Sequence, residues 1–191
     1  MSLRERTVLV SGASRGIGRA TVERLLDDGA KVIGLARTGD NVIEHEHYRH
    51  YLVDLSNLMG AATTLQTLAR ELSEVNALVS NVGAGHFGGL EQFSAEQVCA
   101  SIDLNLTSHI ILVRAFLPCL KRHQFSDVIL MGSESALQGG RKGTLYCAAK
   151  FGLRGFSQSL RLDCSSSGVR VALVNPGMVR TSFFDEQSFR P

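Results

Sequence analysis

Short apolar runs alternate along the chain with longer segments of helical periodicity. The runs are rich in Val, Ile and Leu and alternate little with polar residues, which is typical of strands that helices cover on both faces. They predict strands at residues 7–10, 31–36, 51–53, 77–80, 128–131 and 169–174. Because helical segments separate these strands, the pattern predicts an α/β fold with a parallel sheet.

Apolar positions at helical spacing predict helices over residues 18–28, 61–72, 105–122 and 144–163. Ser94 and Gln97 form a capping-box pattern, which predicts a short helix leading into the third of these. Right-handed crossovers place the helices on both faces of one sheet. No repeat or linker divides the sequence, so residues 1–191 are expected to form a single domain.

Composition narrows the class of protein. Hydrophobic residues make up 44% of the chain and charged residues 20%, which excludes a disordered or fibrous protein. The net charge of +2 is too small to favour nucleic acid or an anionic membrane as a partner. No run of 18 apolar residues and no signal-type start is present, so a soluble, cytoplasmic protein is expected.

The cysteines lack CxxC spacing and lie in apolar or helical surroundings, as expected for reduced core thiols. They are Cys99, Cys119, Cys147 and Cys164.

The first predicted strand runs directly into the glycine-rich sequence SGASRGIGRA. Gly12, Gly16 and Gly18 then lie at a strand-to-helix turn of the kind that binds a dinucleotide pyrophosphate. Glycine there permits a tight turn, close approach to phosphate and close contact of helix with strand. The spacing is GxxxGxG and not GxGxxG, so a simple glycine-rich loop is the alternative interpretation.

A literal GxGxxG occurs later, in GAGHFG, at Gly83, Gly85 and Gly88. No helix is predicted to begin at Gly88, and no strand with a terminal acid follows at the expected separation. We therefore interpret this segment as a flexible loop that borders a ligand.

The end of the second strand, GLARTGD, bears on the choice of cofactor. An acid there binds the ribose 2′-hydroxyl of NAD, whereas an arginine binds the 2′-phosphate of NADP. Ala36 stands where the acid is expected, and Arg37 and Arg15 could converge on one phosphate, which favours NADP(H). Two solvated arginines are the alternative, and the nearby Asp40 leaves NAD(H) possible.

Tyr146 and Lys150 form a YxxxK pair in a predicted helix, where i, i+4 spacing places both on one face. The ammonium is expected to lower the phenol pKa, which would give a proton donor and acceptor near neutral pH. Ser133 directly follows the fifth strand, at the carboxyl edge where parallel sheets bind ligands. Asn81 and Asn105 are expected near the same edge, although such residues are often only caps or turns.

These motifs, in this order, resemble the short-chain dehydrogenase/reductase family. SGASRGIG is similar to its TGxxxGIG cofactor turn, SNVG stands where NNAG is usual, and NPGMVRT is similar to the segment that closes over the nicotinamide. The resemblance covers nearly the whole chain. It implies a Rossmann-like, doubly wound parallel sheet with strand order 3-2-1-4-5-6 and an NADP(H)-preferring enzyme.

The resemblance also implies roles for single residues. Tyr146 would give a proton to a carbonyl oxygen as hydride arrives from the nicotinamide, and Ser133 would hydrogen-bond that oxygen. Lys150 would bind the nicotinamide ribose and lower the pKa of Tyr146, and Asn105 would keep a water in the proton relay. The implied cofactor-binding residues are Gly12, Ser14, Arg15, Gly16, Ile17, Gly18, Arg37, Asp54, Leu55, Asn81, Gly83, Tyr146, Lys150, Pro176, Gly177, Val179 and Thr181.

The chain departs from the family pattern in three places. Ser80 and Val82 replace an Asn and an Ala of NNAG, and Gly132 replaces a Ser that is frequent just before the catalytic one. None of these replacements is expected to abolish catalysis. Family members usually continue into a lid, a helix and a seventh strand that this sequence does not contain. We expect the sixth strand to be an unpaired edge and a further C-terminal segment to exist. An intact mass equal to that of the 191 residues would contradict this expectation.

Two charged segments could each bind a ligand or could simply form a solvated surface. His45, His47 and His50 could bind a metal, but alternate positions on a strand edge favour a solvated face, and no metal is expected. Arg141 and Lys142 could meet an acidic substrate, but solvated charge is favoured.

The predicted helices 105–122 and 144–163 carry apolar residues beyond a single stripe, which together with the resemblance predicts a homodimer or homotetramer.

The function expected is hydride transfer between NADP(H) and a small-molecule carbonyl or secondary alcohol, with Tyr146 as general acid and base. Candidate substrates are a 3-oxoacyl thioester, a 3-hydroxy acid, a steroid-like ketone and a small xenobiotic carbonyl. The alternative is a non-catalytic NADP-binding sensor or scaffold, which the presence of both Tyr146 and Lys150 disfavours.

Overall fold

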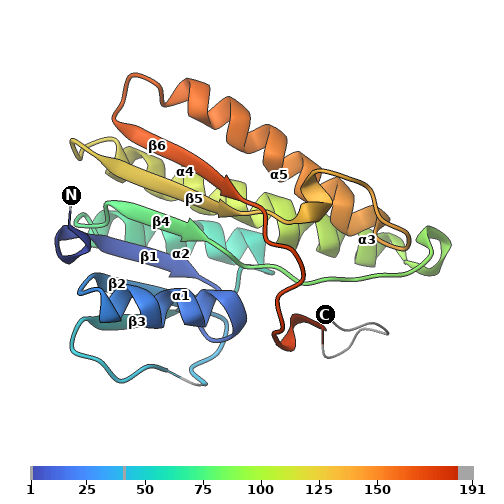
Figure 1. Cartoon of the computed structure of the whole chain (residues 1–191), viewed down its shortest axis with the longest axis horizontal. Coiled ribbons are helices and arrows are strands. Elements are labelled where there is room, and N and C mark those ends of the chain that lie inside the picture. The colour runs from blue at the N-terminus through green and yellow to red at the C-terminus, as the bar shows by residue number, and fades with distance from the viewer. Residues whose placement is uncertain (1, 41, 185–191) are drawn as a thin grey trace.

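A computed structural model describes residues 2–40 and 42–184 of the chain. Within these residues, six strands form one parallel sheet in the order β3-β2-β1-β4-β5-β6 (Figure 1). The strands are β1 Thr7–Ser11, β2 Lys31–Ala36, β3 Tyr48–Leu52, β4 Ala77–Ser80, β5 Ser126–Met131 and β6 Val169–Val174. The helices are α1 Gly16–Asp27, α2 Leu58–Glu71, α3 Ala95–Ile102, α4 Ser108–Leu120 and α5 Thr144–Asp163. The predicted α/β class and strand order are confirmed.

Helices cover both faces of the sheet, as the apolar strand sequences predict. Helix α1 lies on one face over β1 and β2, and α2, α4 and α5 lie on the other (Figure 1). Leu9 of β1 belongs to the larger core beneath α2, α4 and α5, whereas Val8 and Val10 belong to the smaller core beneath α1. Every residue of β1 is buried, which explains why its sequence lacks polar alternation.

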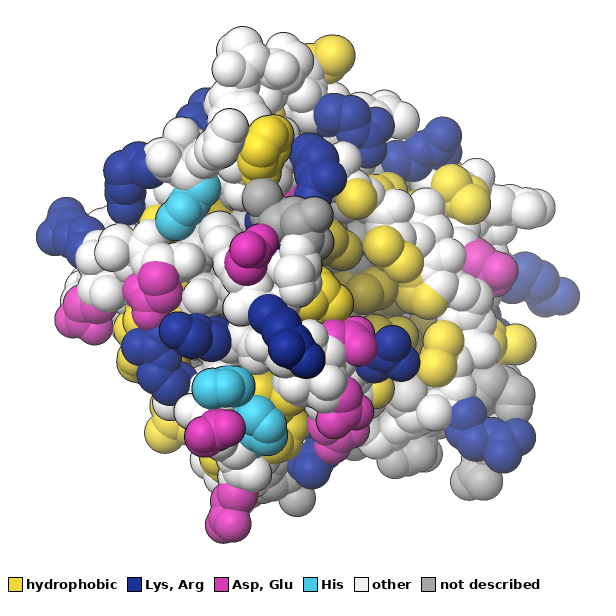
Figure 2. All heavy atoms as spheres, turned by 60° about the vertical axis from the view of Figure 1, so that its left-hand side comes forward, with side chains coloured by type: hydrophobic (Ala, Val, Ile, Leu, Met, Phe, Trp, Pro, Cys, Tyr) yellow, Lys and Arg dark blue, Asp and Glu magenta, His cyan; other side chains and the backbone are white. Residues whose placement is uncertain are grey.

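The two edges of the sheet are more polar than its centre. Strand β3 begins at Tyr48, earlier than the predicted residue 51, because its sequence YRHYL is that of a partly exposed edge and gives no apolar run. In the described part of the chain β6 is the other edge, as predicted, and its residues Arg170, Ala172 and Val174 are exposed on the α1 side. Figure 2 shows hydrophobic side chains at the floor of a hollow on this side.

Helices α3 and α4 form one continuous stretch, Ala95–Leu120, joined by the π-helical segment Asp103–Thr107. The sequence predicts two separate helices here. The stretch is long and apolar enough to cross a membrane, but a core helix of a globular protein satisfies the same criteria. Leu112, Phe116 and Leu120 are fully buried in the core, whereas Ile110 and Ile111 of the same stretch are partly exposed.

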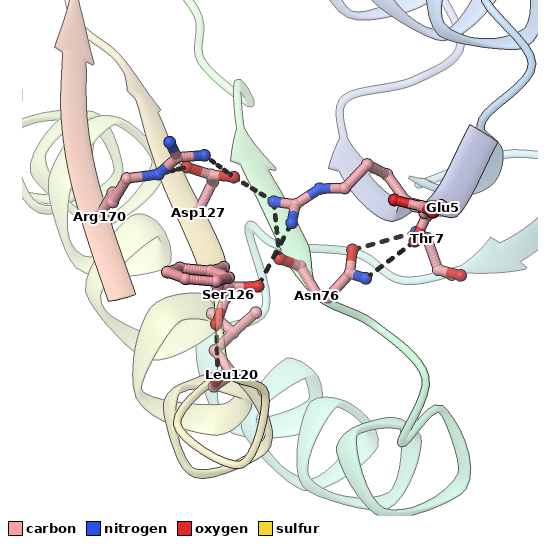
Figure 3. Close-up of polar contacts among 9 residues, drawn as sticks. Glu5, Thr7, Asn76, Leu120, Ser126, Asp127 and Arg170 are labelled. Atoms are coloured by element: carbon pink, nitrogen blue, oxygen red, sulfur yellow. Dashed lines mark hydrogen bonds and ion pairs between the residues drawn. The ribbon is translucent and has the colours of Figure 1, made fainter. Parts of the chain in front are cut away.

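A network of polar contacts ties together the amino ends of the central strands (Figure 3). The buried Arg6 guanidinium donates to the carbonyls of Asn76 (3.1 Å) and Phe125 (3.3 Å) and forms an ion pair with Asp127. Arg170 of β6 donates two further bonds to Asp127, of 2.8 and 3.0 Å. This network fixes the amino ends of β1, β5 and β6 relative to one another.

Candidate active site

The glycine-rich turn between β1 and α1 has the conformation that its sequence predicts. Gly12 and Gly16 have φ of +67° and +56°, in the left-handed region that favours glycine. A Cβ on Gly18 would collide with the carbonyl oxygen of Gly12, so this glycine permits close contact of helix with strand. Arg15 occupies the N-cap without a side-chain cap hydrogen bond, so its side chain does not occupy the first N–H groups of α1. The turn therefore fits an anionic ligand.

A cavity of about 680 Å³ lies at the carboxyl ends of the strands and brings together nearly all the predicted site residues. Two do not line it. Gly18 is buried between α1 and the turn, and Asn105 is buried behind the loop after β4. The predicted residues along its wall are Gly12, Ser14, Arg15, Gly16, Ile17, Arg37, Asp54, Leu55, Asn81, Gly83, Ser133, Tyr146, Lys150, Pro176, Gly177, Val179 and Thr181.

One end of the cavity is charged. Arg15, Arg37, Asp40 and Asp54 all line it there. The Asp54 carboxylate accepts bonds from the Ser56 hydroxyl (2.6 Å) and backbone N–H (2.9 Å), and these bonds, with the Arg37 charge, lower the pKa of Asp54. The two arginines border the same space, as the sequence predicts, and Asp40 borders it too.

Asn81 links the end of β4 to the glycine-rich turn. Its amide nitrogen donates to the carbonyls of Ser11 (3.2 Å) and Gly12 (3.4 Å), and the Ser11 hydroxyl accepts from the backbone N–H of Asn81 (3.0 Å). This side chain therefore sets the position of two cavity walls relative to each other.

The unusual Ser80 has a partner that sequence reasoning does not single out. Its hydroxyl forms a 2.7 Å hydrogen bond with Nδ1 of His109 on α4, and both residues are fully buried. Burial, with a smaller effect of the Lys150 charge, lowers the pKa of His109 to about 3. The pair is therefore neutral at physiological pH and connects α4 to the end of β4, directly before Asn81.

Ser133, Tyr146 and Lys150 lie together at the other end of the cavity. The Lys150 ammonium donates to the Met131 carbonyl (2.9 Å) and lies 5.6 Å from the centroid of the Tyr146 ring. Burial lowers the pKa of Lys150 to about 8. The Ser133 hydroxyl accepts a bond from the Ser135 N–H (3.2 Å), and Ser133 and Tyr146 both line the cavity.

The expected lowering of the Tyr146 pKa is wrong for this structure. Burial raises the pKa of Tyr146, and the hydrogen bond with Ser133 offsets this only in part. Helical spacing brings Lys150 near the ring, but the ammonium is directed at the Met131 carbonyl. The phenol is consequently protonated at neutral pH and can act as a proton donor.

Asn105 holds the loop after β4. Its side-chain oxygen accepts from the N–H of Ala84 (3.1 Å), and its nitrogen donates to the carbonyls of Ala84 (2.9 Å) and Ser101 (3.0 Å). It lies in the π-helical segment, an irregularity that frequently marks functional sites. Its part in a proton relay stays a prediction.

The other candidate groups lie outside the cavity. Tyr48 bonds to Nδ1 of His50 (3.1 Å), and no group of three metal-ligating side chains is present in the part of the chain described. Arg141 and Lys142 are exposed and do not line the cavity. All four cysteines are free; Cys99 is exposed, unlike the other three, and so is not a core thiol as predicted.

Comparisons with known proteins agree with this geometry. A model of the short chain dehydrogenase family matches residues 6–189. The 3-oxoacyl-acyl-carrier-protein reductase FabG of Escherichia coli is 32% identical over 186 residues, covering 95% of this chain and 76% of that protein. A 3-ketodihydrosphingosine reductase of Bacteroides thetaiotaomicron is 28% identical over 181 residues, covering 95% of this chain and 66% of that protein.

Solved structures show the same likeness. The ligand-free aldohexose dehydrogenase of Thermoplasma acidophilum superposes with a TM-score of 0.86 at 28% identity, covering 95% of this chain and 69% of that one. A Beutenbergia cavernae protein, assigned as an NAD(P)-dependent gluconate 5-dehydrogenase and holding NADP at low occupancy, has the same TM-score and identity, with 94% and 74% covered. The match over nearly the whole length, together with the glycine-rich turn and the Ser133, Tyr146 and Lys150 cluster, establishes that the chain is an oxidoreductase of the short-chain dehydrogenase family.

Proposed function

We propose that this chain transfers hydride between NADP(H) and a carbonyl or secondary alcohol, with residues 1–191 acting as one domain. The observation that carries the proposal is that Tyr146, Ser133 and Lys150 line the same cavity as a turn suited to phosphate. A bound nicotinamide cofactor would supply the hydride. The residues fit such a group, because the turn offers left-handed glycines and α1 presents N–H groups at the cavity.

In the direction of reduction, the chain orients the carbonyl and supplies a proton. The Ser133 hydroxyl holds the carbonyl oxygen, and Tyr146 donates its phenolic proton to that oxygen. Lys150, held by the Met131 carbonyl, presents its charge next to the phenol and would bind the ribose of a nicotinamide cofactor. In the direction of oxidation, Tyr146 accepts the proton.

The proposal is tested by incubating the purified protein with NADPH and a panel of neutral ketones. We expect NADPH to be consumed with one equivalent of alcohol formed. Tight NADPH binding without consumption on any carbonyl would favour the alternative, a non-catalytic NADP-binding sensor or scaffold.

The preference for NADP(H) over NAD(H) rests on Arg15 and Arg37. We expect Arg37→Asp to lower the NADP/NAD ratio of kcat/KM by about tenfold or more, since it removes a 2′-phosphate partner and adds a like charge. Arg70→Asp, an exposed position on α2 outside the cavity, is the matched control. An unchanged ratio in Arg37→Asp would contradict the role of this arginine.

We further propose a cytoplasmic homo-oligomer. Eight apolar residues of α4 and α5 divide into two groups. Val113, Phe116, Leu153 and Leu160 are buried in the core, whereas Ile110, Ile111, Phe151 and Phe156 are partly or fully exposed. The second group supports association through these helices. A monomeric mass by light scattering at micromolar concentration would contradict this proposal.

A further inference from the structure

The segment GAGHFG carries a literal GxGxxG but uses its glycines for a different purpose. A Cβ on Gly83 would lie 3.0 Å from Oδ1 of Asn105 and 3.8 Å from Nζ of Lys150. A Cβ on Gly85 would lie 2.8 Å from the Phe183 ring and would also meet the Phe87 ring. These glycines therefore allow the loop to approach catalytic groups and aromatic rings, not a phosphate.

Two phenylalanines flank the ring of Tyr146. The centroid of Phe87 lies 5.5 Å from that of Tyr146 with planes inclined by 50°, and Phe183 lies at 5.9 Å and 57°. These are ordinary distances and inclinations for tilted aromatic pairs. Phe87 follows β4 and Phe183 follows β6, so segments distant in sequence both contribute to the cavity wall. We refer to Phe87, Phe183 and Gly85 as the aromatic wall.

Charges of both signs lie at this end of the cavity, the cation Lys150 and the anion Glu134. Lys150 is bound to the Met131 carbonyl, and the arginines that line the cavity, Arg15 and Arg37, belong to the turns after β1 and β2. Glu134 adjoins Ser133 and lines the cavity, with a carboxylate oxygen 2.9 Å from the position of a Cβ on Gly177. Because the Lys150 ammonium is held by the Met131 carbonyl, a substrate carboxylate on the Glu134 side of the carbonyl would meet a like charge.

We propose that the aromatic wall selects a neutral ketone, or its alcohol, whose carbonyl carries an aryl or similarly flat apolar group, and that Glu134 disfavours substrates with a carboxylate close to the carbonyl. The proposal rests on the oxidoreductase function proposed above and names its substrate class. Flat apolar groups gain from contact with ring faces and edges, whereas a polyhydroxylated chain would lose hydrogen bonds to water there.

Two matched pairs of substrates, assayed with NADPH in excess, test the proposed substrate class. Acetophenone and propanone differ by a phenyl ring in place of a methyl group. Methyl 4-oxo-4-phenylbutanoate and 4-oxo-4-phenylbutanoate differ chiefly by one negative charge. We expect kcat/KM to be about tenfold or more higher for acetophenone than for propanone, the factor typical of burying several apolar carbons. We also expect the ester to be reduced faster than the anion.

Single substitutions test whether the aromatic wall and Glu134 cause these substrate preferences. Phe87→Ala and Phe183→Ala should bring the ratio of acetophenone to propanone towards one, and Phe87→Leu should retain part of it. Phe125→Ala, which truncates an exposed ring just before β5, should leave the ratio unchanged. Glu134→Gln should raise the rate on the anion relative to the ester. A wild-type protein without the phenyl preference, or alanine variants that keep it, would overturn the proposal.

A second measurement separates the proposal that the aromatic wall selects aryl ketones from the proposal that the chain is an active oxidoreductase. If no ketone consumes NADPH, ligand-observed NMR measures binding of acetophenone and propanone to the protein–NADPH complex. Preferential binding of acetophenone that is lost in Phe87→Ala would uphold the aromatic wall while contradicting catalysis, and equal binding would overturn the wall. A preference for an aldohexose over acetophenone or its alcohol would also overturn it.

Discussion

The two ends of the central strands use similar polar residues in opposite ways. At the amino ends, Arg6, Asn76, Asp127 and Arg170 bind to one another and to backbone carbonyls (Figure 3). At the carboxyl ends, Ser133, Tyr146 and Lys150 line a cavity, and burial shifts the pKa values of the tyrosine and the lysine. Polar groups bound to one another stabilise the fold, whereas groups that face a cavity remain available for chemistry.

The direction of the chain explains why the cavity forms at the carboxyl ends. In a parallel sheet every strand leaves at the same edge, and there α1 and α5 begin and present their N-terminal N–H groups. The glycine-rich turn and Ser133 follow strands directly at this edge, and Tyr146 lies in the first turn of α5. At the amino ends the chain only enters the strands from the preceding segments, and the hydrogen bonds of Arg6 hold these ends together.

The largest effect is expected at the carboxyl end, from Tyr146→Phe. Removal of the phenolic proton should lower kcat by about 10²–10⁴-fold while the NADPH dissociation constant stays nearly unchanged. Steady-state turnover and a fluorescence titration measure the two quantities. Tyr51→Phe on β3, which packs at the edge of the core, is the matched control. A substantial residual rate would show that another group donates the proton.

At the amino end, Arg6→Met should affect stability and leave the site intact. The side chain is 5% exposed and its loss leaves Asp127 and two carbonyls without this partner, so we expect the free energy of unfolding to fall by roughly 3 kcal/mol. Urea unfolding measures the loss. NADPH affinity of the folded protein should not change, and a weakened cofactor site would show that the two ends are coupled.

The buried Lys150 predicts a pH dependence of stability. Its pKa is about 8 in the folded protein and 10.5 as an ordinary lysine, so between these values the unfolded chain binds more protons than the folded one. Stability of the wild type relative to Lys150→Met should therefore rise with pH across this window, by at most about 1.4 kcal/mol per pH unit. Tyr146, whose pKa is raised, opposes this only above its ordinary value of 10.0. Urea unfolding of both proteins at several pH values measures this. The same pH dependence in the wild type and in Lys150→Met would contradict the lowered pKa of a buried Lys150.

The smallest effect is expected from Arg170→Gln, in the same network as Arg6. Arg170 is 70% exposed, so solvent screens its bonds to Asp127, and its removal should cost at most about 1 kcal/mol of unfolding free energy. Chemical denaturation beside Arg6→Met gives the comparison. A loss as large as that of Arg6→Met would mean that exposure does not distinguish the two arginines.

Much of the fold was predictable because its determinants are local. The apolar runs of β1, β2 and β4 indicate strands covered on both faces, whereas the polar β3 has no such pattern and its first residues were missed. The glycine-rich turn and the i, i+4 pair of Tyr146 and Lys150 are likewise readable from spacing.

The remaining features of the site depend on contacts between distant segments. Ser80 and His109 are 29 residues apart, and no local pattern connects them. Phe87 and Phe183 meet Tyr146 only after the sheet has brought their segments together. Spacing also predicted that Lys150 lies near Tyr146 but could not reveal the burial that raises the tyrosine pKa.

We propose that a nicotinamide cofactor binds at the carboxyl ends of these strands. Titration of the purified protein with NADPH and NADH in parallel, followed by fluorescence, tests it most directly. We predict tight binding of NADPH and weak binding of NADH, because Arg15 and Arg37 border the charged end of the cavity. Binding of neither nucleotide would contradict the account.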